Sequence, residues 1–169
     1  SPRIGVYPGT FDPITRGHVD IALRASRMVD KLVIAIAANP GKNPLFTVHE
    51  RMSMAIETFE ALKHKADNIE VKTFDTLLMN FMIEQESHII VRGLRAVSDY
   101  EYEYQMAAIN RKMNPDVETM FLTASDDCHF ISSRFVRDIA WHGGDVSKFV
   151  PSCAVPHIIE RIKQKKEHK

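Results

Sequence analysis

Short apolar runs that alternate with helical segments constrain the fold of this chain more than any other feature. The clearest run, KLVIAIAA at 31–38, is apolar at positions that would face both sides of a sheet. A strand of this kind belongs in a sheet that is covered on both faces. We expect five strands, at 3–7, 31–38, 69–73, 88–92 and 118–122.

The segments between these runs have helical periodicity. We expect helices over 19–28, from 47, over 77–85, over 98–113, from 132 and over 155–166. Thr47 followed by Glu50 predicts a capping box, and Ser98 followed by Glu101 predicts another. The expected apolar stripe of the second helix is Met52, Ala55, Ile56, Phe59 and Leu62.

Strands and helices that alternate with short connections predict an α/β fold. The expected architecture is a Rossmann-like, doubly wound, five-stranded parallel sheet with helices on both faces. We find no internal repeat and no linker, so we expect a single domain over 1–169. Such sheets bind ligands at the carboxyl ends of their strands, near the point where the strand order reverses.

Composition narrows the classes of function. The chain has 22 basic and 22 acidic residues, and this balance argues against a nucleic-acid partner. Its two cysteines cannot build a disulfide framework and suit a reducing compartment. The longest apolar run, 32–38, is too short to span a membrane, and residues 1–4 lack the apolar core of a secretory signal. We therefore expect a cytoplasmic protein with no membrane partner.

A loop rich in glycine and proline, YPGTFDPITRGH at 7–18, follows the first strand. Gly9 would let the backbone approach a ligand closely. Gly17 and His18 start a helix whose free N–H groups attract anions, and His18 could donate to a phosphate oxygen. The spacing matches neither a Walker A loop nor G-x-G-x-x-G. The alternative is a rigid turn in which His18 only caps the helix.

Three further segments place polar residues at strand ends. Arg92 and Arg95 follow the fourth strand and suit bidentate phosphate contacts, although a surface ion pair would explain them equally well. Lys42 lies in a Pro/Gly loop after the second strand. Ser132 and Ser133 open a helix, where they could cap it or present hydroxyl and N–H groups to a triphosphate.

Together these segments are similar to bacterial phosphopantetheine adenylyltransferases. The matching pieces are YPGTFDPITRGH, NPGKNPLF, RGLRAVSDYEYE, FISSRFVRDIA and GDVSKFVP, and T-R-G-H fits the nucleotidyltransferase signature T-x-G-H. The resemblance implies transfer of AMP from ATP to 4′-phosphopantetheine. The products would be dephospho-CoA and pyrophosphate, in the penultimate step of coenzyme A synthesis. It also implies Mg²⁺ bound with ATP and a homohexamer.

The resemblance also implies roles for single residues. His18 would stabilise the transition state, assisted by Thr10, Lys42 and Arg95. Implied ATP contacts are Thr10, Phe11, His18, Gly93, Leu94, Arg95, Glu103, Cys128, His129, Phe130, Ile131, Ser132, Ser133 and Arg134. Implied contacts to phosphopantetheine are Thr10, Lys42, Leu78 and Arg92.

The chain departs from the family pattern at three of these positions. Cys128 and His129 stand where an aromatic residue and a serine are expected, and Arg134 stands where a small residue is common. No side-chain cluster has the spacing of a structural metal site, so we expect no metal held by the protein alone.

Two other functions stay open. Another small nucleotidyltransferase, such as a nicotinamide-mononucleotide adenylyltransferase, would share T-x-G-H and the two serines but not the block RGLRAVSDYEYE. A nucleotide sensor without catalysis would keep Ser132 and Arg95 but should lack His18 and Lys42, and both residues are present.

Overall fold

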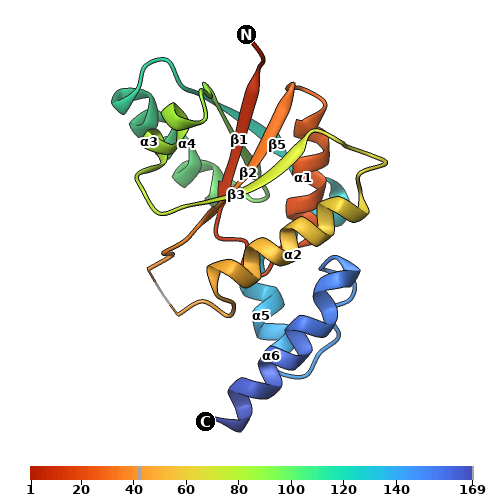
Figure 1. Ribbon diagram of the computed structural model, residues 1–169. Coiled ribbons are helices and arrows are strands. Elements are labelled where there is room, and N and C mark those ends of the chain that lie inside the picture. Colours follow the sequence, from red (N-terminus) through yellow and green to blue (C-terminus); the bar gives the residue numbers. More distant parts are fainter. Residues whose placement is uncertain (42, 169) are drawn as a thin grey trace.

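Five parallel strands form a single sheet in the order β3-β2-β1-β4-β5. The computed structural model describes residues 1–41 and 43–168. The strands are β1 (Ile4–Gly9), β2 (Lys31–Ala37), β3 (Ile69–Phe74), β4 (Ile89–Leu94) and β5 (Glu118–Thr123). This arrangement confirms the expected doubly wound sheet (Figure 1).

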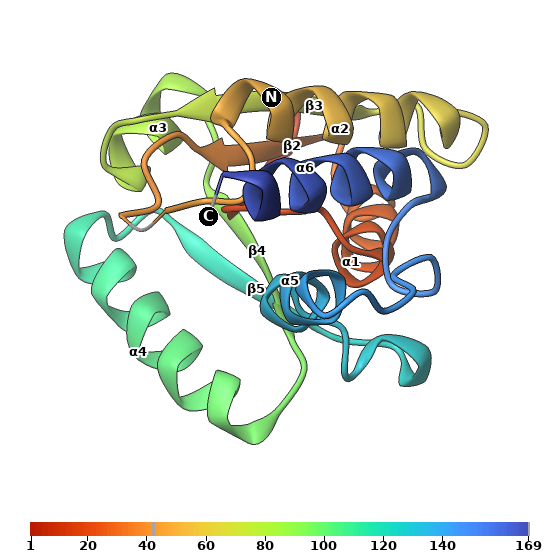
Figure 2. The same ribbon diagram turned by 90° about the horizontal axis from the view of Figure 1, so that it is seen from below.

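Helices cover both faces of the sheet. They are α1 (Arg16–Ser26), α2 (Val48–Ala61), α3 (Leu78–Glu84), α4 (Val97–Met113), α5 (Ser133–Trp141) and α6 (Val155–Glu167). Helices α3 and α4 lie together on one side, while α1, α2, α5 and α6 lie on the other (Figures 1 and 2). Within 1–41 and 43–168, no helix combines the length and the apolar character needed to cross a membrane.

The core consists of two apolar layers separated by the sheet. On one side Leu32, Ile34 and Ile36 pack among apolar residues of α1, α2, α5 and α6. On the other side Val33 and Ala35 pack against α3. Successive residues of β2 therefore point into different layers, and both layers are apolar. This is why the sequence of β2 is apolar without alternation.

Local sequence signals predicted two helix starts correctly and one wrongly. Thr47 and Glu50 form the expected capping box of α2, and Ser132 caps α5 by accepting from the N–H of Phe135. Helix α4, however, begins at Val97, and its N-cap, Ala96, makes no side-chain cap hydrogen bond. The capping box expected from Ser98 is therefore wrong. Because β4 ends at Leu94, the chain turns into the helix before it reaches Ser98.

The buried face of α2 is rotated from the expected stripe. Its buried residues are Arg51, Met54, Ala55, Thr58 and Phe59, whereas the expected core residue Ile56 is 41% exposed. The rotation follows from Arg51, which is only 1% exposed. Its guanidinium donates to backbone carbonyls inside the protein, so this face of the helix must turn inward.

Strands β1 and β4 separate toward their carboxyl ends. They pair only at Gly5 with Ile89 and at Val6 with Ile90, although both strands continue beyond these positions. Here the strand order also reverses, since β2 and β3 extend the sheet on one side of β1 while β4 and β5 extend it on the other. Open α/β sheets bind their ligands at such a point.

Candidate active site

Two adjoining cavities open where β1 and β4 separate. The first has a volume of about 340 Å³ and is called here the His18 cavity, after the histidine that lines it. The second has a volume of about 320 Å³ and is called the Leu78 cavity, after the first residue of α3. Thr10 and Arg92 line both cavities. Two ligands could therefore meet at these two residues.

Most of the residues that the sequence predicts to contact ATP or phosphopantetheine line these cavities. Those that line the His18 cavity are Thr10, Phe11, His18, Arg92, Gly93, Arg95, Glu103, Cys128, Ile131, Ser132, Ser133 and Arg134. Leu78 lines the second cavity.

Three predicted contact residues in the described part of the chain, Leu94, His129 and Phe130, are not among the lining residues of either cavity. Phe130 is 83% exposed, and Nδ1 of its neighbour His129 lies 3.0 Å from the carbonyl oxygen of Arg95. Neither residue lines these cavities, and the ATP contacts expected of both stay predictions. Leu94 is held in the ladder between β4 and β5, opposite Thr123. Lys42 lies outside the described residues.

His18 is fixed by a capping box at the start of α1. The N-cap is Thr15, whose Oγ1 accepts from the N–H of His18 at 3.3 Å. In return, the backbone N–H of Thr15 donates to Nδ1 of His18 at 3.0 Å. A backbone N–H can only donate, so Nδ1 accepts and the proton of the neutral ring sits on Nε2. His18 thus caps the helix with one nitrogen and keeps an Nε2–H donor for the cavity.

The surroundings of His18 keep its imidazole neutral. Burial, followed by the nearby charges of Arg95 and Arg92, lowers the pKa of His18 to about 3. At neutral pH the ring is therefore a hydrogen-bond donor without charge. Such a donor can bind a phosphate oxygen without adding to the positive charge of the two arginines.

Phe11 holds the histidine ring from one side. Its ring centroid lies 4.6 Å from that of His18 and 5.4 Å from that of Tyr7. Phe11 adopts a φ of 53°, and a side chain on Gly9 would approach its ring to 3.0 Å. Gly9 is thus required because Phe11 packs against it. Gly9 also lines both cavities, so the expectation that it lets a ligand approach the backbone stays a prediction.

Arg92 spans the gap between the separated strands. Its Nε and Nη2 donate to the two carboxylate oxygens of Glu103, at 3.0 and 2.6 Å, and its Nη1 donates to the carbonyl of Pro8 in β1 at 2.6 Å. Glu103, which is expected to contact ATP and lines the His18 cavity, therefore also orients Arg92. Burial disfavours the charge on Arg92, but Glu103 outweighs this effect and raises the pKa of the arginine. Two of its five N–H donors are left for a ligand.

Arg95 points to a different part of the site. Its Nη1 donates to the carbonyl of Ile131 at 3.1 Å, and its Nε lies 3.4 Å from a carboxylate oxygen of Asp99. Both arginines pair with carboxylates of α4, but Arg92 also contacts β1, whereas Arg95 contacts the segment that leads into α5. The two guanidiniums consequently have separate neighbours.

The start of α5 completes the His18 cavity. Ser132 caps the helix, and the hydroxyl of Ser133 donates to the carbonyl of Pro13 at 2.8 Å. Arg137, which the sequence did not nominate, lines the same cavity and donates to the carbonyl of Asp12 at 2.6 Å. Its position one helical turn after Ser133 was the signal that could have identified it.

The described residues offer no ready-made metal site. Across 1–41 and 43–168, no three His, Cys, Asp or Glu side chains are grouped closely enough to hold a metal ion. The charges that line the His18 cavity are largely those of arginines, and these suit an anionic ligand.

Comparison with known proteins defines the class. Residues 6–139 match the model of the cytidylyltransferase-like family, so the chain is a nucleotidyltransferase of this family. A phosphopantetheine adenylyltransferase of Rhodospirillum centenum is 51% identical over 96% of this chain and 88% of its own length. One of Nitrosomonas eutropha is 53% identical over 95% and 93%. Within the class, the chain belongs to the phosphopantetheine adenylyltransferase family.

Solved structures agree on the fold. A Plasmodium falciparum nicotinic acid mononucleotide adenylyltransferase, complexed with APC, superimposes with a TM-score of 0.67 over 98% of this chain and 96% of its own. A putative nicotinate-nucleotide adenylyltransferase from Vibrio parahaemolyticus gives 0.64 over 98% and 94%. Their identities to this chain are 16% and 14%, so the likeness concerns the fold alone.

Proposed function

We propose that this protein transfers the adenylyl group of ATP to 4′-phosphopantetheine, which yields dephospho-CoA and pyrophosphate. The names of its relatives, which are about half identical to it, support this reaction. The main structural support for this reaction is the pair of adjoining cavities, which share Thr10 and Arg92. A reaction that joins two phosphate-bearing ligands needs two sites that meet at one wall.

The reaction requires the protein mainly to position the two ligands and to stabilise negative charge. An oxygen of the acceptor phosphate attacks the α-phosphorus of ATP, and the bond from that phosphorus to the bridging oxygen of the β-phosphate breaks. Pyrophosphate leaves with the electron pair of that bond. Preorganised donors at the α-phosphate and a fixed line of attack therefore supply most of the catalysis.

The site suggests where each ligand binds. In this proposal ATP occupies the His18 cavity, with Nε2–H of His18 and the guanidinium of Arg95 directed to its phosphates. Arg134, Arg137 and the first-turn N–H groups of α5 line the same cavity or open onto it. These donors would bind the β- and γ-phosphates, which leave as pyrophosphate.

The acceptor would lie in the Leu78 cavity. Phe74, Leu78 and Met106 give this cavity apolar walls that suit the pantetheine arm. Arg92 and Thr10, at the wall shared with the His18 cavity, would bind the phosphate at the end of that arm. Lys42 is proposed as a further ligand of this phosphate.

We propose that Mg²⁺ enters with ATP and is held mainly by phosphate oxygens. Bound there, the ion would neutralise charge that develops on pyrophosphate. Two carboxylates line the His18 cavity, those of Asp99 and Glu103, and they pair with Arg95 and Arg92 respectively.

A coupled pyrophosphate-release assay tests the reaction. The purified protein should release pyrophosphate from ATP only when 4′-phosphopantetheine is present, and mass spectrometry should identify dephospho-CoA. Nicotinamide mononucleotide and nicotinic acid mononucleotide serve as competing acceptors, and CTP as a competing donor. Faster release with a mononucleotide acceptor would assign the protein to the alternative activity.

The cellular setting is part of the proposal. The cysteines Cys128 and Cys153 are both free, which supports a reducing, cytoplasmic compartment. A homo-oligomer, with the hexamer implied by the resemblance, is supported by α4, which exposes Tyr100, Tyr104 and Ile109. Light scattering on the purified protein measures the assembly, and a monomer at micromolar concentration would contradict it.

A further inference from the structure

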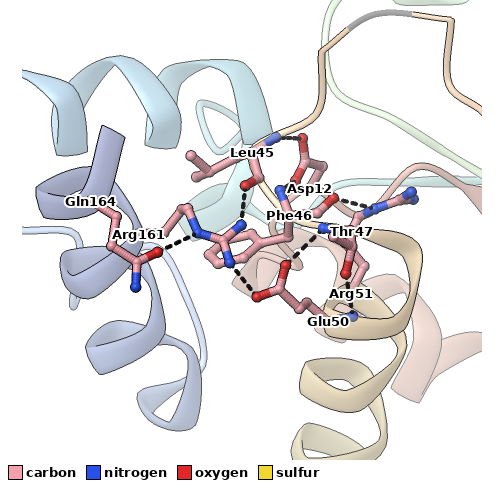
Figure 3. Close-up of polar contacts among 8 residues, drawn as sticks. All are labelled: Asp12, Leu45, Phe46, Thr47, Glu50, Arg51, Arg161 and Gln164. Atoms are coloured by element: carbon pink, nitrogen blue, oxygen red, sulfur yellow. Dashed lines mark hydrogen bonds and ion pairs between the residues drawn. The ribbon is translucent and has the colours of Figure 1, made fainter. Parts of the chain in front are cut away.

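Two consecutive residues after β2 have every polar backbone group bound by a charged side chain. The N–H groups of Leu45 and Phe46 donate to the two carboxylate oxygens of Asp12, at 2.7 and 2.9 Å. The carbonyl of Leu45 accepts from Nη1 of Arg161 at 2.7 Å, and that of Phe46 accepts from Nε of Arg51 at 3.1 Å. Figure 3 shows the three charged side chains around this dipeptide. Leu45 and Phe46 are thereby fixed by the loop after β1, by α2 and by α6.

Arg161 connects the last helix of the chain to this dipeptide. It stands on α6, forms an ion pair with Glu50 of α2 and places its guanidinium 5.1 Å from the ring centroid of Phe46. Its Nε donates to Gln164 at 3.1 Å, one turn further along α6 (Figure 3). The side chain of Arg161 is 22% exposed. A long side chain held by this many partners gives its neighbours a defined position.

A short chain of contacts leads from the dipeptide to the reaction site. Besides Phe46, the guanidinium of Arg51 donates from Nη1 to the carbonyls of Thr10 at 2.9 Å and Ala37 at 2.7 Å. Thr10 and Ala37 both line the Leu78 cavity. Asp12 lies two residues after Thr10 in the same loop. Arg161 is therefore linked to Thr10 through Leu45 and Phe46 by two routes.

We propose that Arg161 is a positioning residue for the acceptor, acting through Leu45 and Phe46 on the wall of the Leu78 cavity. The proposal rests on the proposed function, because it assigns that cavity to phosphopantetheine. The contacts made through the dipeptide lead to Thr10, which follows β1, and to Ala37, the last residue of β2. The His18 cavity is walled in addition by Arg95 and α5. Helix α5 meets this network at Arg137, which donates to the carbonyl of Asp12, whereas Arg51 joins the dipeptide directly to Thr10 and Ala37. Acceptor binding should therefore depend on Arg161 more than ATP binding does.

Steady-state kinetics separate positioning from general stability. Arg161→Ala should raise KM for phosphopantetheine about tenfold, the effect of one lost charged hydrogen bond, with kcat and KM for ATP within about twofold of wild type. The KM of Arg161→Lys for phosphopantetheine should lie between those of wild type and Arg161→Ala. The lysine ammonium can pair with Glu50 but cannot reproduce the planar fork of the guanidinium. If Arg161 only stabilised the packing of α6, its removal would lower the fraction of active enzyme and thus kcat. Both KM values would then stay unchanged.

Arg111→Ala is the matched control. Arg111 also forms an ion pair, with Glu118 at 2.7 Å, but both side chains are well exposed and lie on α4 and β5. Its removal should leave all three kinetic constants unchanged. If Arg161→Ala does not fold, Arg161→Gln replaces it and is judged by the same criterion.

Hydrogen exchange gives a readout without turnover. The amides of Leu45 and Phe46 should exchange faster in Arg161→Ala than in wild type, while those of β2 stay protected. Unchanged exchange, or an unchanged KM for phosphopantetheine in an active enzyme, would overturn the positioning role. A wild-type protein that does not adenylylate phosphopantetheine would overturn the proposed function instead, so the two failures are distinguishable.

Discussion

The backbone N–H of Thr15 donates to Nδ1 of His18 over 3.0 Å, and this contact gives the histidine two roles at once. One nitrogen completes the cap of α1, and the other keeps its proton for a ligand. Capping and phosphate binding, which are alternatives when only the sequence is considered, are compatible because imidazole has two distinct nitrogens. The cap also aims the ring before any ligand arrives.

The first prediction concerns the Nε2–H donor. Changing His18 to alanine should reduce kcat by about a hundredfold or more, because one preorganised donor at the reacting phosphate is worth that much. Circular dichroism should show a folded protein, with a modest loss of thermal stability from the missing cap. The control is His64→Ala, at an exposed histidine, which should keep the wild-type rate. A folded His18→Ala enzyme with near-normal turnover would refute the role.

The second prediction is a pH dependence. The pKa of His18 in the folded protein is about 3, below its usual value of 6.5. Between these values the unfolded chain binds the proton that the folded one excludes, so this contribution to stability is present above pH 6.5 and declines as the pH falls toward 3. Ring ¹⁵N NMR should therefore show a neutral His18 with its proton on Nε2 from pH 5 to 8. Titration of this ring above pH 6 in the free enzyme would contradict the prediction.

The third prediction separates the two arginines by ligand. Arg95→Ala should weaken ATP and pyrophosphate by roughly 1.5–3 kcal/mol, and Arg92→Ala should weaken mainly phosphopantetheine. Lysine at either position should rescue binding only in part, because it cannot form a bidentate fork. Calorimetry with each ligand alone provides the measurement. Normal binding of both ligands by both alanine variants would show that neither arginine serves the site.

The fourth prediction concerns stability. Arg92→Ala leaves the carboxylate of Glu103, which is 11% exposed, without its partner. Breaking a buried pair costs about 3–5 kcal/mol, and the partial exposure of Arg92 reduces the expected cost to about 1–3 kcal/mol. Removing the carboxylate as well, in Arg92→Ala with Glu103→Gln, should recover part of the loss. Urea unfolding measures both, and a double variant no more stable than Arg92→Ala would argue against the stranded charge.

The fifth prediction concerns Lys42, which lies outside the described residues. Its place in a Pro/Gly loop after β2 indicates that Lys42→Ala should spare the stability of the fold. Phosphopantetheine binding or the transfer rate should decline more than ATP binding does. Equal losses for both ligands in calorimetry would count against an acceptor-side role.

Local patterns predicted what is determined locally. The apolar run of β2 defined the covered sheet, and Thr47 with Glu50 marked the start of α2, because both signals depend on residues within a few positions of one another. A capping role for His18 was one of two expected alternatives, but its partner Thr15 was not identified, because a histidine occupies the position where Glu or Gln usually completes the box. The start of α4 was misplaced because the end of β4, rather than Ser98, decides it.

Long-range contacts were beyond the reach of the sequence pattern. Arg51 resembles a solvent-facing residue of an amphipathic helix, yet it is buried because carbonyls from two strand ends and a loop converge on it. Asp12 reaches across 33 residues to bind Leu45. Glu103 turned out to hold Arg92, a relation that requires α4 to fold back against β4. None of these partners can be identified from spacing along the chain.

The early end of the ladder between β1 and β4 affects which acceptors a fold of this kind can accommodate. Because the two strands part after Val6 and Ile90, the crevice arises from the path of the main chain and not from any particular side chain. Substitutions around it can change which acceptor is admitted without abolishing the opening itself. A Plasmodium falciparum nicotinic acid mononucleotide adenylyltransferase has the same fold at 16% identity, so this path of the main chain tolerates extensive change in sequence.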